Sequence, residues 1–209
     1  MNIIEPKIEN YIANLPSADD PVLKEMEAHA RRHHFPIIGA MAGRFLRQLA
    51  LASNARSIFE MGSGYGYSAY WFAGGMTGGG RIICTDMSED NRQRGLDYLE
   101  RGGCKSKVEF HAGDALKIIG KFDGPFDIIL NDIDTESYPE AFELAVPRLR
   151  RGGIFITDNV LWSGRILHRK PTAASRAILE FNRGLFNSKD ILSSLIPIHD
   201  GLGMAIKIV

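Results

Sequence analysis

Acidic residues and glycines stand at the end of five short apolar runs, where strands are expected to end. With their closing polar residues, the runs are SIFEMGSGYGYS (57–68), RIICTD (81–86), VEFHAGD (108–114), FDIILND (126–132) and GGIFITDN (152–159). Ligands of an open α/β sheet bind just outside the carboxyl ends of its strands. The five polar groups are therefore expected to converge on one edge and to form a cofactor site with a cation site beside it.

The first run is followed by a glycine loop with the spacing G-x-G-x-G, at Gly62, Gly64 and Gly66. Glycine lets the chain turn tightly and lets the backbone approach a ligand closely. The sixth position of the G-x-G-x-x-G pattern of dinucleotide sites is Tyr67 here, so the loop departs from that pattern. The glycines alone predict a ligand loop but do not identify the ligand.

Three acids beside this loop narrow the choice of ligand. Glu60 would repel a pyrophosphate, but it suits the ammonium and sulfonium of S-adenosylmethionine (SAM). Asp86 stands at the second strand tip, where an acid typically accepts hydrogen bonds from two ribose hydroxyls. Asp114 is expected at the adenine amino group, as the N-cap of the next helix, or in both roles. The alternative for Glu60 is a plain surface charge.

A second acidic group follows the fourth and fifth runs. Asp132 closes one of them, and Asp158 with Asn159 closes the other. If these two strands are neighbours, three hard oxygen donors come together, a set that suits Mg²⁺ or a similar divalent cation. The alternative is that the acids cap helices or pair with nearby arginines.

Composition excludes several classes of protein. The 209 residues carry 25 basic and 25 acidic side chains, so no long-range field favours nucleic acid or an acidic membrane. Cys84 and Cys104 are too few for a disulfide framework and fit a reducing compartment. No apolar run approaches the roughly 20 residues of a membrane span. A cytoplasmic protein with no nucleic-acid or membrane partner is expected.

The periodicity predicts a single domain, with three helices up to residue 52 and alternating strands and helices from 53 to 209. The expected strands are 55–61, 81–86, 107–112, 126–132, 153–158, 192–199 and 204–209, and the expected helices between them are 65–73, 89–101, 115–119, 138–149 and 172–186. A parallel pair needs a crossover of a dozen or more residues, and only 200–203 separate the last two strands. They must form an antiparallel hairpin, so the sheet is mostly parallel with a reversed final strand.

The sequence resembles the cation-dependent, SAM-dependent O-methyltransferases, the group that contains the catechol and caffeoyl-CoA O-methyltransferases. The resemblance runs from about residue 36 to 209, and its most specific segments are DNVLWSG (158–164) and HDGLGMA (199–205). It implies a class I methyltransferase (Rossmann-like) α/β fold with a seven-stranded sheet and helices on both faces. It also implies SAM and a divalent cation as cofactors, a small hydroxyl acceptor, and a homodimer in which residues 1–52 cover the acceptor.

The resemblance assigns roles to matching positions. It places SAM against Ile38, Glu60, Gly62, Gly64, Gly66, Ser68, Asp86, Met87, Asp114, Ala115 and Asp132. It makes Asp132, Asp158 and Asn159 the metal ligands and thereby the catalytic residues. Trp162 would flank the acceptor, and a place in the core is the alternative for this side chain.

One position departs from the family pattern. The family has a lysine, its general base, three residues after the first metal aspartate, and this chain has Thr135. A threonine hydroxyl is neither a useful acid nor a useful base near neutral pH. Either the metal alone acidifies the acceptor, or His168, Lys170 or His199 serves instead, or the acceptor is unusual, or activity is lost. A SAM-binding protein without turnover and, more remotely, a nicotinamide-dependent oxidoreductase are the competing hypotheses.

Overall fold

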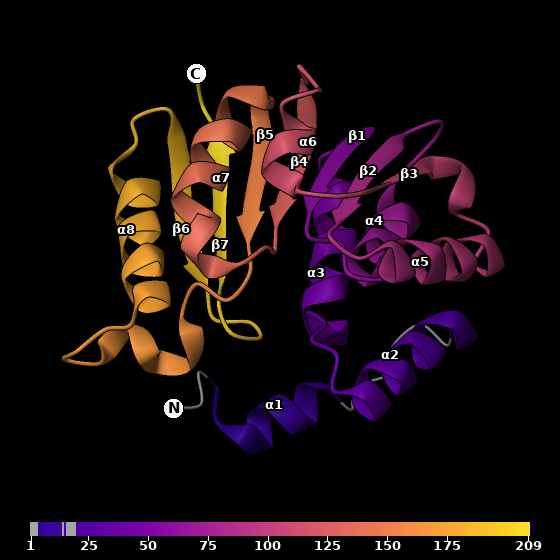
Figure 1. The fold of residues 1–209 in the computed structure, drawn as a ribbon, viewed down its shortest axis with the longest axis horizontal. Coiled ribbons are helices and arrows are strands. Elements are labelled where there is room, and N and C mark those ends of the chain that lie inside the picture. The colour runs from indigo at the N-terminus through magenta and orange to yellow at the C-terminus, as the bar shows by residue number, and fades with distance from the viewer. Residues whose placement is uncertain (1–3, 14, 16–19) are drawn as a thin grey trace.

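The computed structural model describes residues 4–13, 15 and 20–209 of the chain. In this part, seven strands form one sheet in the order β3-β2-β1-β4-β5-β7-β6 (Figure 1). The strands are β1 (Ser57–Met61), β2 (Arg81–Asp86), β3 (Val108–Ala112), β4 (Phe126–Asn131), β5 (Leu149–Thr157), β6 (Ile191–Ile196) and β7 (Leu202–Lys207). β1 to β5 pair in parallel, and β7 runs antiparallel to both β5 and β6. The prediction of a mostly parallel sheet with a reversed last strand is confirmed.

Helices cover both faces of this sheet, as predicted. The α-helices are α1 (Pro6–Ala13), α2 (Pro21–His33), α3 (Gly39–Ala52), α4 (Tyr67–Gly75), α5 (Glu89–Arg101), α6 (Ala115–Ile119), α7 (Tyr138–Ala145) and α8 (Ala173–Asn187), and short 3₁₀ turns cover Lys105–Lys107, Thr135–Ser137, Val146–Arg148 and Trp162–Leu167. α1 and α2 lie beyond the carboxyl ends of the strands (Figure 1). The three N-terminal helices expected up to residue 52 are present, except that positions 1–3, 14 and 16–19 lie outside the described residues.

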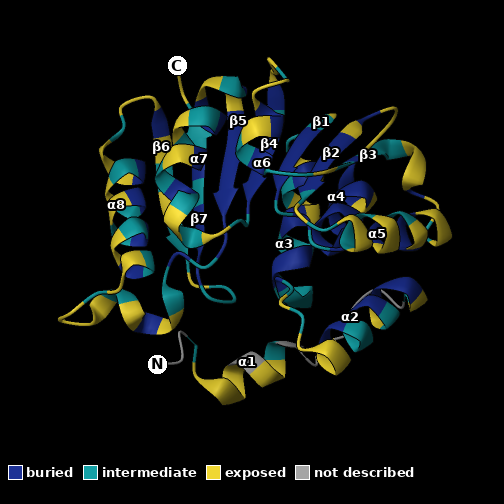
Figure 2. Cartoon of the chain, in the orientation of Figure 1, coloured by how far each residue is buried: buried dark blue, intermediate teal, exposed yellow. Residues whose placement is uncertain are grey.

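Two hydrophobic cores lie on opposite faces of the sheet, because neighbouring strand residues point to opposite sides. Ile58 packs with α3, α4 and α5, and Phe59 packs with α6, α7 and α8. Ile82 and Ile83 divide in the same way between the two cores. The strands are therefore buried on both sides (Figure 2), which explains why their sequences are continuously apolar and do not alternate.

Several element ends differ from the predictions. β1 begins at Ser57, and the final hairpin is shifted, because β6 ends at Ile196 and β7 covers Leu202–Lys207. Three other differences have clear structural reasons. α4 begins at Tyr67, two residues later than predicted, because Gly64 and Gly66 have positive φ angles that an α-helix cannot contain. α7 ends at Ala145, and a 3₁₀ turn with Pro147 follows it. β5 begins at Leu149, which pairs with Phe126 across an irregularity in the register.

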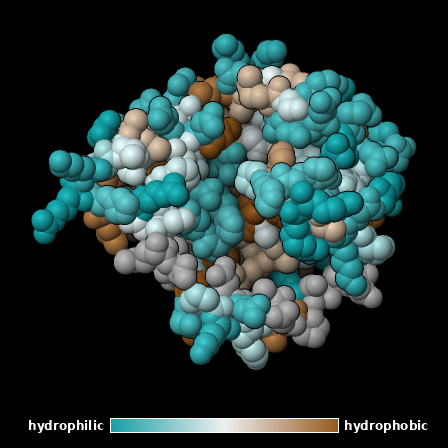
Figure 3. All heavy atoms as spheres, turned by 60° about the horizontal axis from the view of Figure 1, so that its bottom comes forward, coloured by the Kyte–Doolittle hydropathy of each residue, from teal (hydrophilic) through white to brown (hydrophobic). Residues whose placement is uncertain are grey.

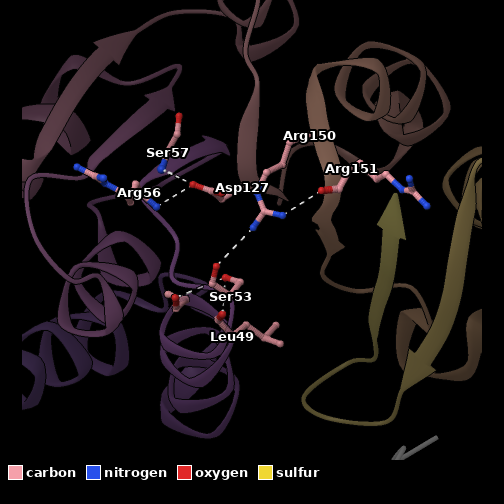
Figure 4. Close-up of polar contacts among 8 residues, drawn as sticks. Leu49, Ser53, Arg56, Ser57, Asp127, Arg150 and Arg151 are labelled. Carbon is pink, nitrogen blue, oxygen red and sulfur yellow. Dashed lines mark hydrogen bonds and ion pairs between the residues drawn. The ribbon is translucent and has the colours of Figure 1, made fainter. Parts of the chain in front are cut away.

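A polar cluster around Asp127 lies at the amino-terminal ends of the central strands (Figure 4). Its carboxylate accepts hydrogen bonds from the main-chain N–H groups of Arg56 (2.7 Å) and Ser57 (2.8 Å) and from Nε of Arg150 (2.6 Å). The Arg150 guanidinium also donates to the carbonyl of Ser53 (3.4 Å), just after α3. The starts of β1, β4 and β5 are thus tied together at the end away from the predicted site.

None of the described helices combines the length and the apolar character needed to cross a membrane.

Candidate active site

The glycine loop and the acids Asp132 and Asp158 lie at the carboxyl ends of β1, β4 and β5, which are neighbours in the sheet. Two main-chain hydrogen bonds extend the ladder past the strands: Asp132 N–H donates to the Met61 carbonyl (2.8 Å), and Asp158 N–H donates to the Asn131 carbonyl (3.2 Å). The glycine loop and both acids are therefore held side by side. Seen from this edge, hydrophobic side chains lie in a hollow between hydrophilic surroundings (Figure 3).

Gly62 fixes the glycine loop against the tip of β4. Its φ angle is +83°, and a Cβ at this position would lie 2.2 Å from the main-chain oxygen of Asp132. Any side chain would therefore both strain the backbone and push the loop away from the acid. Gly66, with a φ angle of 80°, is the N-cap of α4, so the loop opens directly into a helix N-terminus. This geometry suits a ligand that contacts the main chain.

A small cavity of about 30 Å³ lies between this loop and the connection from α2 to α3. Its lining includes the predicted cofactor residues Ile38, Gly62, Gly64, Ser68 and Asp132, and also Phe35, Pro36, Ile37, Ser63, Tyr65 and Tyr67. Sequence reasoning did not assign Ser63, Tyr65 or Tyr67, although all three belong to the loop motif. A larger cavity of about 320 Å³, between α2, α3, α4 and the end of α5, contains none of the predicted site residues.

Glu60 lies beneath the loop and is fully buried, so the alternative of a surface charge is wrong. Burial raises the pKa of its carboxyl to about 7, against the opposing effect of hydrogen bonds from Ser63, Ser68 and Cys84. Within the described part of the chain, its Oε1 atom has no hydrogen-bond partner. A buried carboxyl oxygen without a hydrogen-bond or ionic partner destabilises the folded protein. A cationic group in the neighbouring cavity would be such a partner.

The acids after β2 and β3 lie farther along the same edge and do not line the small cavity. Asp86 accepts hydrogen bonds at Oδ1 from Ser88 N–H (2.8 Å) and from Nδ2 of Asn91 (2.9 Å). Asp114 caps α6 by accepting from Leu116 N–H (3.0 Å), so its predicted capping role is confirmed. The remaining predicted positions differ in accessibility: Met87 is exposed and Ala115 is buried.

Asp132 and Asp158 form a closely spaced pair of carboxyls. Asp158 is buried, and Asp132 is half-buried. Burial first, and then the negative charge of Asp158, raises the pKa of Asp132 to about 8, while His199 acts in the opposite direction. Asn159 lies next to the pair, with its N–H donating to Oδ1 of Asp158 (2.8 Å). The structure therefore brings Asp132 and Asp158 together at neighbouring strand ends, with Asn159 next to Asp158 in the sequence. Their joint role as metal ligands stays a prediction.

The donor set fits a hard divalent cation by its chemistry. Carboxylate and amide oxygens are the ligands that Mg²⁺ takes in proteins, and two positive charges would offset the repulsion that raises the pKa of Asp132. The set consists of two carboxylates and one amide. In the described residues, no three His, Cys, Asp or Glu side chains gather as a metal cluster.

Two further side chains contact Asp158. His199 lies in the β6–β7 turn, with Nδ1 3.0 Å from Oδ2 and 3.3 Å from Oδ1 of Asp158. This hydrogen bond is the main reason why the pKa of His199 is raised. Tyr138, at the start of α7, donates its hydroxyl hydrogen bond to the main-chain carbonyl of Asp158 (2.9 Å). Thr135 begins the 3₁₀ turn before Tyr138 and is half-buried.

Trp162 follows the acid pair in a turn of unusual backbone geometry. Trp162, Ser163 and Gly164 all have positive φ angles, and the carboxylate of Asp200 holds the turn by accepting from Ser163 N–H (2.5 Å). The guanidinium of Arg165 lies 5.3 Å from the centre of a Trp162 ring. The indole is half-buried, at the margin of one core. It is therefore not a fully enclosed core residue.

Comparison with known proteins agrees with this fold. The family model described as O-methyltransferase matches residues 14–208. Caffeoyl-CoA O-methyltransferase 3 of Nicotiana tabacum is 29% identical over 202 residues, covering 89% of this chain and 83% of that protein. Catechol O-methyltransferase of Niastella koreensis is 28% identical, covering 98% of each chain.

A solved structure is also closely similar. The O-methyltransferase TomG from Streptomyces achromogenes, in complex with SAM, superposes with a TM-score of 0.89 at 26% identity, covering 97% of this chain and 96% of that one. The fold and the site define a class I methyltransferase. The chain belongs to the O-methyltransferase family, whose members are SAM-dependent enzymes. The nicotinamide-dependent oxidoreductase alternative does not fit this family.

Proposed function

We propose that this O-methyltransferase moves the methyl group of SAM to a hydroxyl of a small, catechol-like acceptor with the help of a divalent cation such as Mg²⁺. The observation that carries the proposal is the acid pair: Asp132 and Asp158 stand side by side, and the charge of one raises the pKa of the other. A bound divalent cation would offset the repulsion between these two carboxylates, so the pair favours cation binding.

The donor would occupy the edge over β1, β2 and β3. Glu60 would offer its carboxylate to the cationic methionine end of SAM, because burial leaves it short of partners. Asp86 would accept from the ribose hydroxyls and Asp114 would lie near the adenine, with its helix cap retained. The relative TomG, crystallised with SAM, supports this choice of donor.

Asp132, Asp158 and Asn159 would hold the cation, which when bound lowers the pKa of a coordinated hydroxyl. The residues themselves do the positioning. Gly62 fixes the donor loop on the β4 tip, and Tyr138 fixes the β5 tip, so both reactants lie on one rigid frame. Such positioning can contribute about 7–11 kcal/mol to lowering a barrier. Trp162 would form one wall of the acceptor site.

The acceptor class is proposed from relatives that are named for caffeoyl-CoA and catechol, both of which present adjacent oxygens. Position 135 is threonine and not lysine, which favours a different mechanism or a different acceptor from those of the relatives. The homodimer and the cytoplasmic location stay predictions.

The test is methylation of a catechol by the full chain with and without Mg²⁺. Asp132→Ala is expected to abolish Mg²⁺-dependent turnover while SAM affinity, measured by calorimetry, changes little. Asp134→Ala is the matched control, because Asp134 is an exposed acid two positions away. Unchanged turnover in Asp132→Ala would contradict the role of the cation. If the wild-type protein does not bind SAM, the proposed methyl donor is wrong.

A further inference from the structure

The turn between β6 and β7 reaches across to the acid pair. Its residue His199 places ring atom Nδ1 3.0 Å from one oxygen of Asp158 and 3.3 Å from the other. Asp158 is almost completely buried, and the imidazole is about one-third exposed (36%). The turn therefore supplies a side chain to a carboxylate that lies 41 positions earlier in the sequence.

The tautomer of this ring follows from the chemistry of its partner. An ionised carboxylate only accepts hydrogen bonds, so Nδ1 of His199 must carry the proton in this contact. Among the described residues, the main-chain N–H of Asn159 is a second donor to the same carboxylate and reaches Oδ1 (2.8 Å). His199 is closest to Oδ2. The two donors together fix the rotation of the carboxyl group.

We propose that His199 is a positioning residue for Asp158: it orients this carboxylate towards the divalent cation and raises the affinity of the site for it. The inference rests on the proposed function, because it presupposes that Asp158 binds a cation. Hydrogen-bonding partners of metal ligands orient them, and their loss typically weakens metal binding 10- to 100-fold.

The backbone at this position supports a role for the side chain. His199 has a φ angle of 55°, a region that glycine adopts freely and other residues adopt at a cost of about 1 kcal/mol. The conformation is held firmly, because the next residues of the turn accept hydrogen bonds from the β5 loop. Leu161 N–H donates to the Asp200 carbonyl (3.0 Å), and Val160 N–H donates to the Gly201 carbonyl (3.1 Å). A strained histidine on a rigid turn can hold a neighbouring carboxylate in one orientation.

The strain also makes a clean experiment possible. His199→Gly removes the ring and relaxes the backbone, so the protein is expected to fold. His199→Asn keeps an amide donor and tolerates a positive φ angle. Asn54→Gly is the matched control, because Asn54 also has a φ angle of 50° but precedes β1 at the opposite edge of the sheet.

The measurement is Mn²⁺ affinity of the full chain, followed by the electron paramagnetic resonance signal of free Mn²⁺, with SAM affinity measured in parallel by calorimetry. His199→Gly is expected to weaken Mn²⁺ binding about 10-fold or more without changing SAM affinity. His199→Asn is expected to recover part of the loss, and Asn54→Gly is expected to bind as the wild type does.

The outcomes separate this inference from the proposed function. Equal Mn²⁺ affinity in His199→Gly and in the wild type would overturn the role of His199 and leave the cation site standing. Equal losses in the glycine and asparagine variants would overturn the role of the donated hydrogen bond. A wild-type protein that binds SAM but no Mn²⁺ would overturn both the cation and this inference, and would leave the methyl donor standing.

Discussion

The hydroxyl of Tyr138 donates a hydrogen bond to the main-chain carbonyl of Asp158 at 2.9 Å, and both residues are buried. Tyr138 begins α7, six residues after Asp132, and Asp158 follows β5. One side chain thus couples the segment that follows the first acid to the backbone that carries the second. The spacing of the pair depends on this contact as well as on the sheet.

Replacing Tyr138 by phenylalanine tests that coupling. The variant leaves a buried carbonyl without its side-chain donor, so the free energy of unfolding is expected to fall by about 1–3 kcal/mol. The Mg²⁺ concentration required for half-maximal turnover should also rise. Tyr70→Phe is the control, because it removes a tyrosine hydroxyl that bonds Asp20 away from the acid pair. An unchanged Mg²⁺ requirement in Tyr138→Phe would show that the contact serves stability alone.

Glu60 should make the stability of the donor-free protein depend on pH. Burial raises its pKa from 4.5 to about 7, so the folded state holds a proton that the unfolded state releases. The stabilisation that Glu60 contributes is complete below pH 4.5 and is lost as the pH rises through 7. The free energy of unfolding should fall by about 3 kcal/mol over this range, at 1.36 kcal/mol per pKa unit. Glu60→Gln should remove it. Urea denaturation at pH 4.5 and 7.5 measures the difference, and equal pH slopes for the two proteins would contradict it.

Asp127 has the opposite pH dependence at the far edge of the sheet. Burial works against its charged form, but hydrogen bonds from Arg150 and from the N–H groups of Arg56 and Ser57 prevail and lower its pKa from 3.8. Its stabilisation is present above pH 3.8 and is lost as the pH falls through the lower folded value. Asp127→Asn should lower the free energy of unfolding by about 1–3 kcal/mol at pH 7.

The effect of Asp127→Asn should shrink below pH 4 and should leave SAM affinity unchanged. The exposed neighbour Asp123 provides the control, since Asp123→Asn changes the same charge outside the cluster. Denaturation curves at pH 7 and pH 3.5 measure both variants. A pH-independent loss in Asp127→Asn would mean that packing, and not charge, is responsible.

Thr135 is the position at which a base would be restored. Thr135→Lys is expected to raise the turnover of a catechol at neutral pH about 10- to 100-fold, since a positioned general base contributes at least this much. Glu136→Gln makes the same change in net charge, +1, one residue away without adding a base, and it controls for charge. The pH dependence of kcat is the measurement. If kcat is equal in Thr135→Lys and the wild type, the chain does not lack a base.

Much of the fold follows from the sequence because local signals and burial agree. The helices 89–101 and 115–119 have the predicted bounds, since Ser88 and Asp114 cap them. The reversed last strand follows from a connection too short for a crossover. The errors fall at element ends, where a glycine φ angle, a proline turn or pairing with a distant segment decides the boundary. β5 starts at Leu149 only because Phe126 lies beside it, and no feature of residues 149–152 alone indicates a strand.

Some features of the candidate site could likewise be predicted from the sequence, and others could not. The ends of strands can be recognised in the sequence, so the approach of Asp132 to Asp158 could be predicted. The contact of His199 with Asp158 could not be predicted, because it depends on a side chain that reaches between segments far apart in the chain. For the same reason, the burial that raises the pKa of Glu60 could not be predicted, because it depends on the packing of α4 and β2 around this side chain.

The close approach of Gly62 to the Asp132 carbonyl has a consequence for how such an enzyme can diversify. Main chain meets main chain there, so the distance between the glycine loop and the end of β4 is set by two backbones and not by a side chain that a substitution could shorten or lengthen. If Trp162 forms the proposed acceptor wall, changes around it would alter which compounds are accepted while this distance stays constant. New substrates can be acquired independently of the chemistry that modifies them.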